Sequence, residues 1–144
     1  MKVQHIMTTE VVTLHVNEEL SLASDIMNLA RIRHLPVVDD ERLVGIISQR
    51  DLYKASLASV MGYNYAETRN HLKKVPIKEV MITELHTIDP DTDVHEAGLI
   101  MLEKKIGCLP VVQGGRLVGM VTETDILRYY IEHHRNCPEE KAPE

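Results

Sequence analysis

The chain has 144 residues and a formal net charge of −6, from 16 Lys and Arg against 22 Asp and Glu. This acidic balance argues against a sequence-independent grip on nucleic acid or on an anionic membrane surface, and no apolar run approaches the roughly 20 residues that span a bilayer. Two Cys and an N-terminus without the apolar region of a secretory signal argue against a disulfide framework, so the expected location is cytoplasmic.

The chain repeats itself after 74 residues, because residues 3–54 align without gaps with residues 77–128. The clearest match is Leu35-Pro36-Val37-Val38 against Leu109-Pro110-Val111-Val112. A unit of about 52 residues is marginal as a separate domain, so we expect the two copies to share a core as a pseudo-symmetric pair. The expected organisation is repeat 1 at 1–54, a helical connector at 55–76, repeat 2 at 77–131 and a flexible tail at 132–144.

Both repeats predict the same order of elements. An extended piece comes first, at Val11–Leu14 and Leu85–Ile88, and a helix follows whose N-cap is expected at Asn17 and at Asp91. Two apolar runs then predict strands on either side of a turn, and a second helix starts near Asp51 and near Asp125. The strands are expected over Leu35–Val38, Leu43–Ile47, Leu109–Val112 and Leu117–Val121. The order is β-α-β-β-α per repeat, an α/β (α+β) fold class.

The connector is predicted to be helical. Ala55–Met61 extends the second helix of repeat 1, and Gly62 is a plausible stop. Asn64 and Glu67 then have the spacing of a capping box for another helix that reaches Lys74.

The pattern Gly-apolar-apolar-Ser/Thr-x-x-Asp occurs twice, from Gly45 to Asp51 and from Gly119 to Asp125, where a strand leads into a helix. One interpretation is an N-cap, with the hydroxyl on a free N–H and the carboxylate in the first turn. The other is a ligand site, because a helix N-terminus attracts phosphate and a carboxylate accepts both hydroxyls of a ribose. The motif alone leaves both open.

The duplicated Leu-Pro-Val-Val and Leu-Val-Gly strands and the Ser/Thr-x-x-Asp pair together resemble a tandem pair of cystathionine-β-synthase (CBS) domains, a Bateman module. The resemblance covers about 3–54 and 77–128. It implies two β-α-β-β-α repeats packed as an intramolecular pseudo-two-fold pair. It also implies clefts for adenosine-containing ligands, and homodimers. The absence of Phe and Trp is compatible with a base held by backbone groups and aliphatic side chains.

The site residues implied by the resemblance fall into three groups. The ribose is expected at Asp51 and Asp125. The phosphates are expected near Ser48, Thr122, Arg33, His34 and Arg50, so that basic residues of repeat 1 neutralise them. The base side of the cleft is expected to contain Thr13, Thr87, Pro36, Pro110, Gly107 and Cys108, with the aliphatic walls Ile6, Val11, Val80 and Leu85.

The function implied is that of a regulatory sensor rather than an enzyme, with no catalytic residue and no metal. Its ligand is expected to be an adenine nucleotide (AMP, ADP or ATP), with NAD and S-adenosylmethionine as further candidates and one or two clefts filled. The module is expected to act in trans on an unidentified protein, and no partnership with nucleic acid or membrane is expected. The alternative is a homodimeric structural adaptor that binds no nucleotide.

Overall fold

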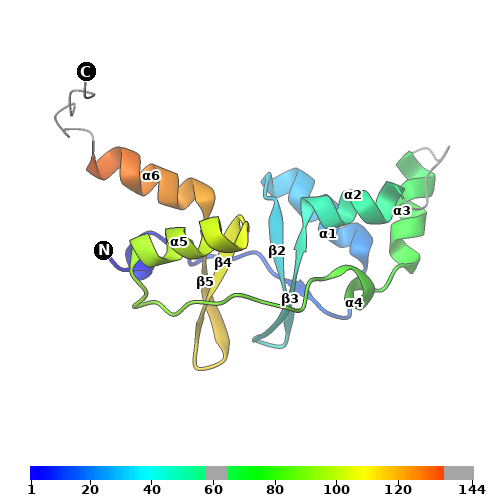
Figure 1. Cartoon of the computed structure of the whole chain (residues 1–144). Helices are drawn as coiled ribbons and strands as arrows, with labels where there is room; N and C mark the ends of the chain where they lie inside the picture. The colour runs from blue at the N-terminus through cyan, green and yellow to red at the C-terminus, as the bar shows by residue number, and fades with distance from the viewer. Residues whose placement is uncertain (58–64, 135–144) are drawn as a thin grey trace, which may run out of the picture.

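The computed structural model describes residues 1–57 and 65–134 of the chain. Figure 1 shows two groups of helices on either side of a set of strands. The first half contains η1 (Val3–His5), β1 (Leu14–His15), α1 (Leu20–Ala30), β2 (His34–Asp39), β3 (Arg42–Ser48), α2 (Gln49–Leu57) and α3 (Tyr65–Lys74). The second half contains α4 (Ile77–Val80), α5 (Val94–Lys104), β4 (Cys108–Gln113), β5 (Arg116–Thr122) and α6 (Glu123–His133).

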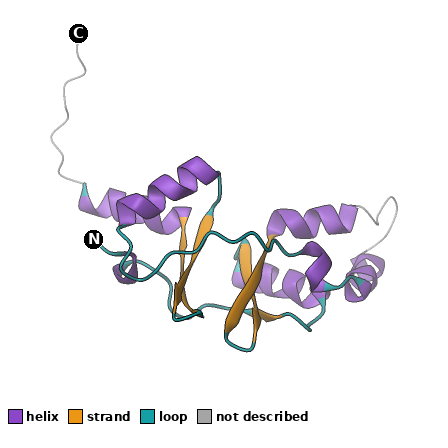
Figure 2. Cartoon of the chain, turned by 60° about the horizontal axis from the view of Figure 1, so that its bottom comes forward, coloured by secondary structure: helices purple, strands orange, loops and turns teal. Residues whose placement is uncertain are grey.

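The strands form one sheet in the order β1-β2-β3-β5-β4. Each repeat contributes an antiparallel hairpin, β2–β3 or β4–β5, and the two hairpins have the same register with a shift at the same place. In the sheet, the two hairpins are joined at their tips, where Arg42 of β3 pairs with Arg116 of β5. Figure 2 shows the strands in the middle, with helices on both sides. The predicted mixed fold of two similar repeats is confirmed.

A proline stands inside each hairpin without breaking it. Pro36 lies opposite Ile46 in the β2–β3 register, and the Ile46 N–H points away from β2 to donate to the Ile82 carbonyl at 3.0 Å. This pair is therefore one of the non-hydrogen-bonded pairs of an antiparallel ladder, where the missing N–H of proline costs no bond.

The opening segment of each repeat pairs with the hairpin of the other repeat. The Thr8 N–H and carbonyl exchange hydrogen bonds of 2.9 and 3.0 Å with Met120 of β5, and Ile82 does the same with Ile46 of β3 at 2.8 and 3.0 Å. After this pairing, residues 8–13 cross from the second repeat to β1 in the first, and residues 82–87 cross in the opposite direction (Figure 1).

The buried apolar side chains follow this exchange. Val3 belongs to the core of repeat 2, and Ile77 and Leu72 belong to the core of repeat 1. A third cluster of Ile46, Cys108 and Met120 lies between the repeats. The shared core expected from the small size of each repeat therefore exists, and it is built by exchanged segments as well as by direct contact.

The first helices begin later than the sequence indicated, and Asn17 and Asp91 are not their N-caps. The N-cap residues are Glu19 and Asp93, and the Asp93 carboxylate accepts the His95 N–H at 2.8 Å. The N–H of Asp91 instead bonds to the Asp89 carboxylate at 2.8 Å, in a turn ahead of the helix. A local pattern of capping residues did not distinguish this turn from the helix start, because both use short polar side chains.

The first extended pieces pair for a shorter length than expected. Strand β1 covers only Leu14–His15, and Ile88 forms a single parallel bridge to Val111. The residues just before β1 and just before Ile88 belong to the segments that cross between the repeats. Among the described residues, no strand lies beside these segments for them to pair with.

The connector contains the expected helix that reaches Lys74, observed as α3 from Tyr65. The predicted extension over Ala55–Met61 is described as far as Leu57, the last described residue of α2, and the predicted stop at Gly62 lies outside the described residues. Helix α6 continues to His133, and 135–144 of the predicted tail also lie outside. Within the described ranges, no helix has the length and apolar character to cross a membrane.

Gly119→Ala tests the exchanged pairing. A Cβ at position 119 would lie 2.6 Å from the Met7 sulfur and 3.0 Å from the Thr8 carbonyl oxygen, so we expect a loss of about 1–3 kcal/mol in unfolding free energy, measured by urea denaturation. Gly98→Ala is the matched control, because its Cβ meets Ile126 at 3.6 Å and alanine favours a helix interior by about 0.5–1 kcal/mol. Equal stability of the two variants would contradict the pairing.

Candidate functional site

A cavity of about 420 Å³ lies at the junction of the two repeats, within the range of about 300–1,000 Å³ that is typical of small-molecule sites. Three segments supply its walls. The lining residues are Thr8, Glu10, Val11 and Val12 of the crossing segment; Arg31, Ile32 and Arg33 between α1 and β2, with His34 and Pro36 of β2; and Gly107, Met120, Thr122, Glu123 and Thr124 of repeat 2.

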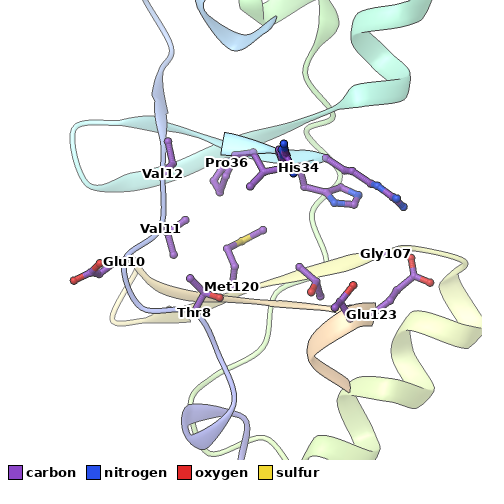
Figure 3. A pocket seen from close by; sticks show the side chains of 14 residues that line it. Thr8, Glu10, Val11, Val12, His34, Pro36, Gly107, Met120 and Glu123 are labelled. Carbon is purple, nitrogen blue, oxygen red and sulfur yellow. The ribbon is translucent and has the colours of Figure 1, made fainter. Parts of the chain in front are cut away.

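The local backbone explains why these residues converge. Helix α1 ends with Arg31 in the left-handed conformation, at φ 54°, which turns the chain sharply into β2 and carries Arg33 and His34 to the cavity. Helix α6 begins directly after β5, so its first residues lie at the same junction. Figure 3 shows His34 and Pro36 on one side of the cavity, with Met120, Glu123 and Gly107 on the other.

The cavity contains two arginines and two carboxylates. Arg31 and Arg33 are exposed, and among the described residues neither forms an ion pair with a carboxylate. Glu10 and Glu123 are the acidic residues of the lining. Unpaired guanidinium groups beside an open cavity are suited to hold an anionic group of a ligand, because they have donors to spare and need no existing contact to be broken.

Gly107 is small for a specific reason. A Cβ at this position would lie 2.5 Å from the Glu123 Oε1 atom and 3.2 Å from the His34 Cε1 atom. Glycine here therefore allows the glutamate of repeat 2 and the histidine of repeat 1 to approach the same point.

His34 is neutral at neutral pH. Burial lowers the pKa of its imidazole below the ordinary value of 6.5, and the nearby Arg33 lowers it further, while the carboxylates of Glu123 and Asp51 oppose the shift. Without a ligand in the cavity, His34 is therefore a hydrogen-bonding group rather than a cation.

Both copies of the Ser/Thr-x-x-Asp motif form helix caps. The Asp125 Oδ2 atom accepts the N–H of Thr122 at 2.9 Å and its hydroxyl at 3.1 Å, and the Asp125 N–H donates to the Thr122 hydroxyl at 3.3 Å. Asp51 and Ser48 repeat the pattern with distances of 2.9, 2.7 and 3.1 Å. The capping interpretation is confirmed, and any contact of these carboxylates with a ligand would add to it.

The predicted site residues divide between the cavity and its surroundings. Thr122, Arg33, His34, Pro36, Gly107 and Val11 line it. The predicted residues that do not line it are Asp51, Asp125, Ser48, Arg50, Thr13, Thr87, Pro110, Cys108, Ile6, Val80 and Leu85. Ser48, Arg50 and Pro110 are the counterparts, 74 residues apart, of the lining residues Thr122, Thr124 and Pro36.

Several lining residues were not predicted, among them Thr8, Glu10, Arg31 and Met120. Thr8 and Glu10 reach the cavity only because their segment crosses between the repeats, and no local pattern indicates such a crossing. Arg31 had a weak signal in the sequence, because another basic residue, Lys105, stands at the equivalent position 74 residues later.

Cys108 packs in the cluster between the repeats and is 6% exposed. Burial, together with the negative charge of Glu123, raises the pKa of its thiol to about 12. A thiol in this state is a small apolar side chain and a poor nucleophile.

Titration of His34 by NMR tests the charge arrangement. The pKa of His34 is expected below 6.5 in the folded chain, and Glu123→Gln should lower it further. The unfolded state then binds a proton at higher pH than the folded state, so the stability contributed by His34 is present above pH 6.5 and is lost as the pH falls toward the lowered pKa. Glu132→Gln, on an exposed part of α6, should leave the pKa unchanged. A pKa above 6.5 would contradict the arrangement.

Thiol labelling tests the burial of Cys108. In a Cys137→Ser variant, Ellman's reagent at pH 8 should label Cys108 at least about a hundredfold more slowly in the native state than in urea. In the native state, burial lowers both the fraction of Cys108 present as thiolate and the access of the reagent to it. Equal rates would show that the thiol is accessible.

Comparison with known proteins places this arrangement in a family. The family model of the CBS domain matches residues 3–58 and 77–132. The A-adding tRNA nucleotidyltransferase of Geobacter sulfurreducens is 33% identical over 133 residues, which are 92% of this chain. The chain spans only 14% of that enzyme's length.

Two solved structures are similar over most of the chain. A candidate acetoin utilization protein (AcuB) from Vibrio cholerae is 35% identical with a TM-score of 0.79, covering 99% of this chain and 98% of that one. The CBS domain pair of protein MJ0100, in complex with 5′-methylthioadenosine and S-adenosyl-L-methionine, is 33% identical with a TM-score of 0.75, covering 90% and 99%. With a CBS domain matched in each half and the same two-repeat architecture, the chain belongs to the CBS-domain family and is a tandem CBS-domain pair.

Proposed function

We propose that this CBS-domain pair is a sensor that binds an adenosine-containing small molecule and regulates a protein partner in response. The observation that carries the proposal is the cavity of about 420 Å³ whose walls come from both repeats. Its ligand is of the AMP, ADP, ATP or S-adenosylmethionine type. The complex of the MJ0100 domain pair with two adenosine-containing ligands supports this ligand class.

The cavity offers the groups that such a ligand needs. Val11, Val12, Ile32, Pro36 and Met120 form an apolar wall for the base. Arg31 and Arg33, together with the Thr124 hydroxyl, offer donors for the 5′ group, whereas the Thr122 hydroxyl already donates to Asp125. The carboxylate of Asp125, next to Thr122, is the proposed ribose acceptor, with Asp51, Ser48 and Arg50 in the equivalent roles of the opposite half.

Binding at a junction explains how a ligand becomes a signal. A ligand that contacts Arg33 of repeat 1 and Thr122 of repeat 2 binds more tightly when the two repeats are held in this arrangement. Such differential affinity shifts the population toward that arrangement, as a sensor requires. A binding role, rather than catalysis, is also what we propose for the carboxylates, because each already caps a helix.

Homodimerisation is part of the proposal. Exposed apolar side chains stand on the helices of both halves. They are Leu22, Leu29 and Tyr53 on α1 and α2, and Leu99, Leu102, Leu127 and Ile131 on α5 and α6. A surface of this kind, outside the cleft, is suited to a second copy of the chain.

The alternative is a homodimeric adaptor with empty clefts, for which the same exposed helices would suffice. Calorimetric titration with AMP, ADP, ATP, NAD, 5′-methylthioadenosine and S-adenosylmethionine separates the two functions. Native mass spectrometry of freshly purified protein reports a co-purified ligand and the oligomeric state together. No heat with any ligand, and no bound small molecule, would favour the adaptor.

Asp125→Ala tests the ribose assignment. We expect ligand binding in the cleft beside Thr122 to weaken by about 1–3 kcal/mol, the scale of a lost hydrogen bond to a charged group, measured by calorimetry. Asp51→Ala is the matched control, because it removes the same helix cap from the other repeat. It should cost comparable stability and change the affinity of this cleft less than Asp125→Ala does, because the Asp51 charge reaches the cleft only at His34. Unchanged affinity in both variants would overturn the assignment.

A further inference from the structure

The feature that the proposed function leaves unexplained is Glu123, an acidic side chain at the end of the cleft where a phosphate is expected. It lines the cavity, and its Oε1 atom lies 2.5 Å from the point where a Cβ of residue 107 would stand. Among the described residues, its carboxylate has no hydrogen-bond donor and no ion pair. Figure 3 shows the side chain beside Gly107, at the opposite end of the cavity from Glu10.

The N-terminus of α6 has little left to offer a phosphate. The Glu123 N–H donates to the Gly107 carbonyl at 3.0 Å, and the N–H groups of Thr122 and Asp125 are used by the capping box. Among the four successive N–H groups of residues 122–125, the Thr124 N–H is the one without an acceptor in the described part of the chain. The Glu123 carboxylate in the first turn also already satisfies the positive end of the helix dipole.

The formal charges of the cavity lining cancel. Arg31 and Arg33 are balanced by Glu10 and Glu123, and the imidazole of His34 is neutral. A triphosphate, with about four negative charges at neutral pH, would need a strong excess of cations or free N–H donors, and the cavity supplies neither. A 5′ group that is uncharged or zwitterionic meets no such penalty.

The first repeat shows that the fold does not require the acidic residue. The equivalent of Glu123 is Gln49, followed by Arg50 where repeat 2 has Thr124. The Gln49 N–H makes the same backbone hydrogen bond, to the Arg33 carbonyl at 2.8 Å. An uncharged residue of nearly the same shape therefore occupies the same backbone position, and the difference between the two is charge.

We propose that Glu123 is a specificity-determining residue, which makes this cleft select an adenosine ligand whose 5′ group carries no net negative charge over a di- or triphosphate. The selection rests on the proposed function, because it presumes that an adenosine ligand binds here. It acts by repulsion: the carboxylate stands where the outer phosphates would lie, while Arg31 and Arg33 hold a carboxylate or other single anion of the preferred ligand.

The experiment measures dissociation constants of 5′-methylthioadenosine, S-adenosylmethionine, AMP and ATP for the full chain and for Glu123→Gln, by calorimetry at fixed ionic strength. The imidazole signals of His34 serve as a reporter that binding takes place in this cleft. We expect the unaltered chain to bind 5′-methylthioadenosine and S-adenosylmethionine more tightly than ATP. Glu123→Gln should tighten ATP binding about five- to tenfold, as expected for one charge removed at close range from a partly exposed site. It should change the affinity for the neutral 5′-methylthioadenosine less than about twofold.

Glu132→Gln is the matched control, because it makes the same change in net charge on an exposed part of α6 away from the cavity. Its effect on ATP binding should be less than about twofold. Tightest binding of ATP by the unaltered chain, or an equal response of ATP and 5′-methylthioadenosine to Glu123→Gln, would overturn the selection and leave the proposed function intact. Binding of none of the four ligands would overturn both.

Discussion

The exchange of opening segments between the two repeats is the constraint on which the rest of the structure depends. Thr8 bonds to β5 of the second repeat and Ile82 to β3 of the first, so the residues that follow must cross the junction. Gly45 and Gly119 permit this, because a side chain at either would meet a methionine sulfur at 2.6 Å. The crossing segment then becomes one wall of the cavity. The same contacts that tie the halves together therefore also build the site.

The Ser/Thr-x-x-Asp motif shows how one set of atoms limits the chemistry of a site. As a capping box, it stabilises the start of α6 and holds Asp125 in a single position, 9% exposed. The same hydrogen bonds consume the N–H groups that make a helix N-terminus attractive to phosphate. What is left is a fixed carboxylate and one N–H, which suits recognition of a ribose and a small 5′ group better than a chain of phosphates.

Pseudo-symmetry gives the two halves one backbone and different charges. Arg33, His34 and Gln49 of repeat 1 correspond to Gly107, Cys108 and Glu123 of repeat 2. These positions converge at the junction, where His34 and Glu123 approach the space left by Gly107. Repeat 1 thus contributes the basic side chains and repeat 2 contributes the glycine and the carboxylate. The charge of the cleft therefore depends on both repeats. In the proposed sensor, a ligand that contacts both halves would bind most tightly when they hold this arrangement.

The sequence by itself determined the repeat, the mixed fold and the hairpin strands, since apolar runs, turns and identical blocks are local signals. It also indicated Arg33, His34, Gly107 and Thr122, which line the cavity. It missed Thr8, Glu10 and Met120, and it placed the N-caps at Asn17 and Asp91 instead of Glu19 and Asp93. Only the tertiary structure decided which repeat each opening segment joins. Met7 and Met81 stand at equivalent positions, and the glycine of β3 or of β5 would leave room for either methionine. That choice of partner sets the walls and the charge of the cleft, and it depends on contacts between residues far apart in the chain, 112 positions in the case of Thr8 and Met120.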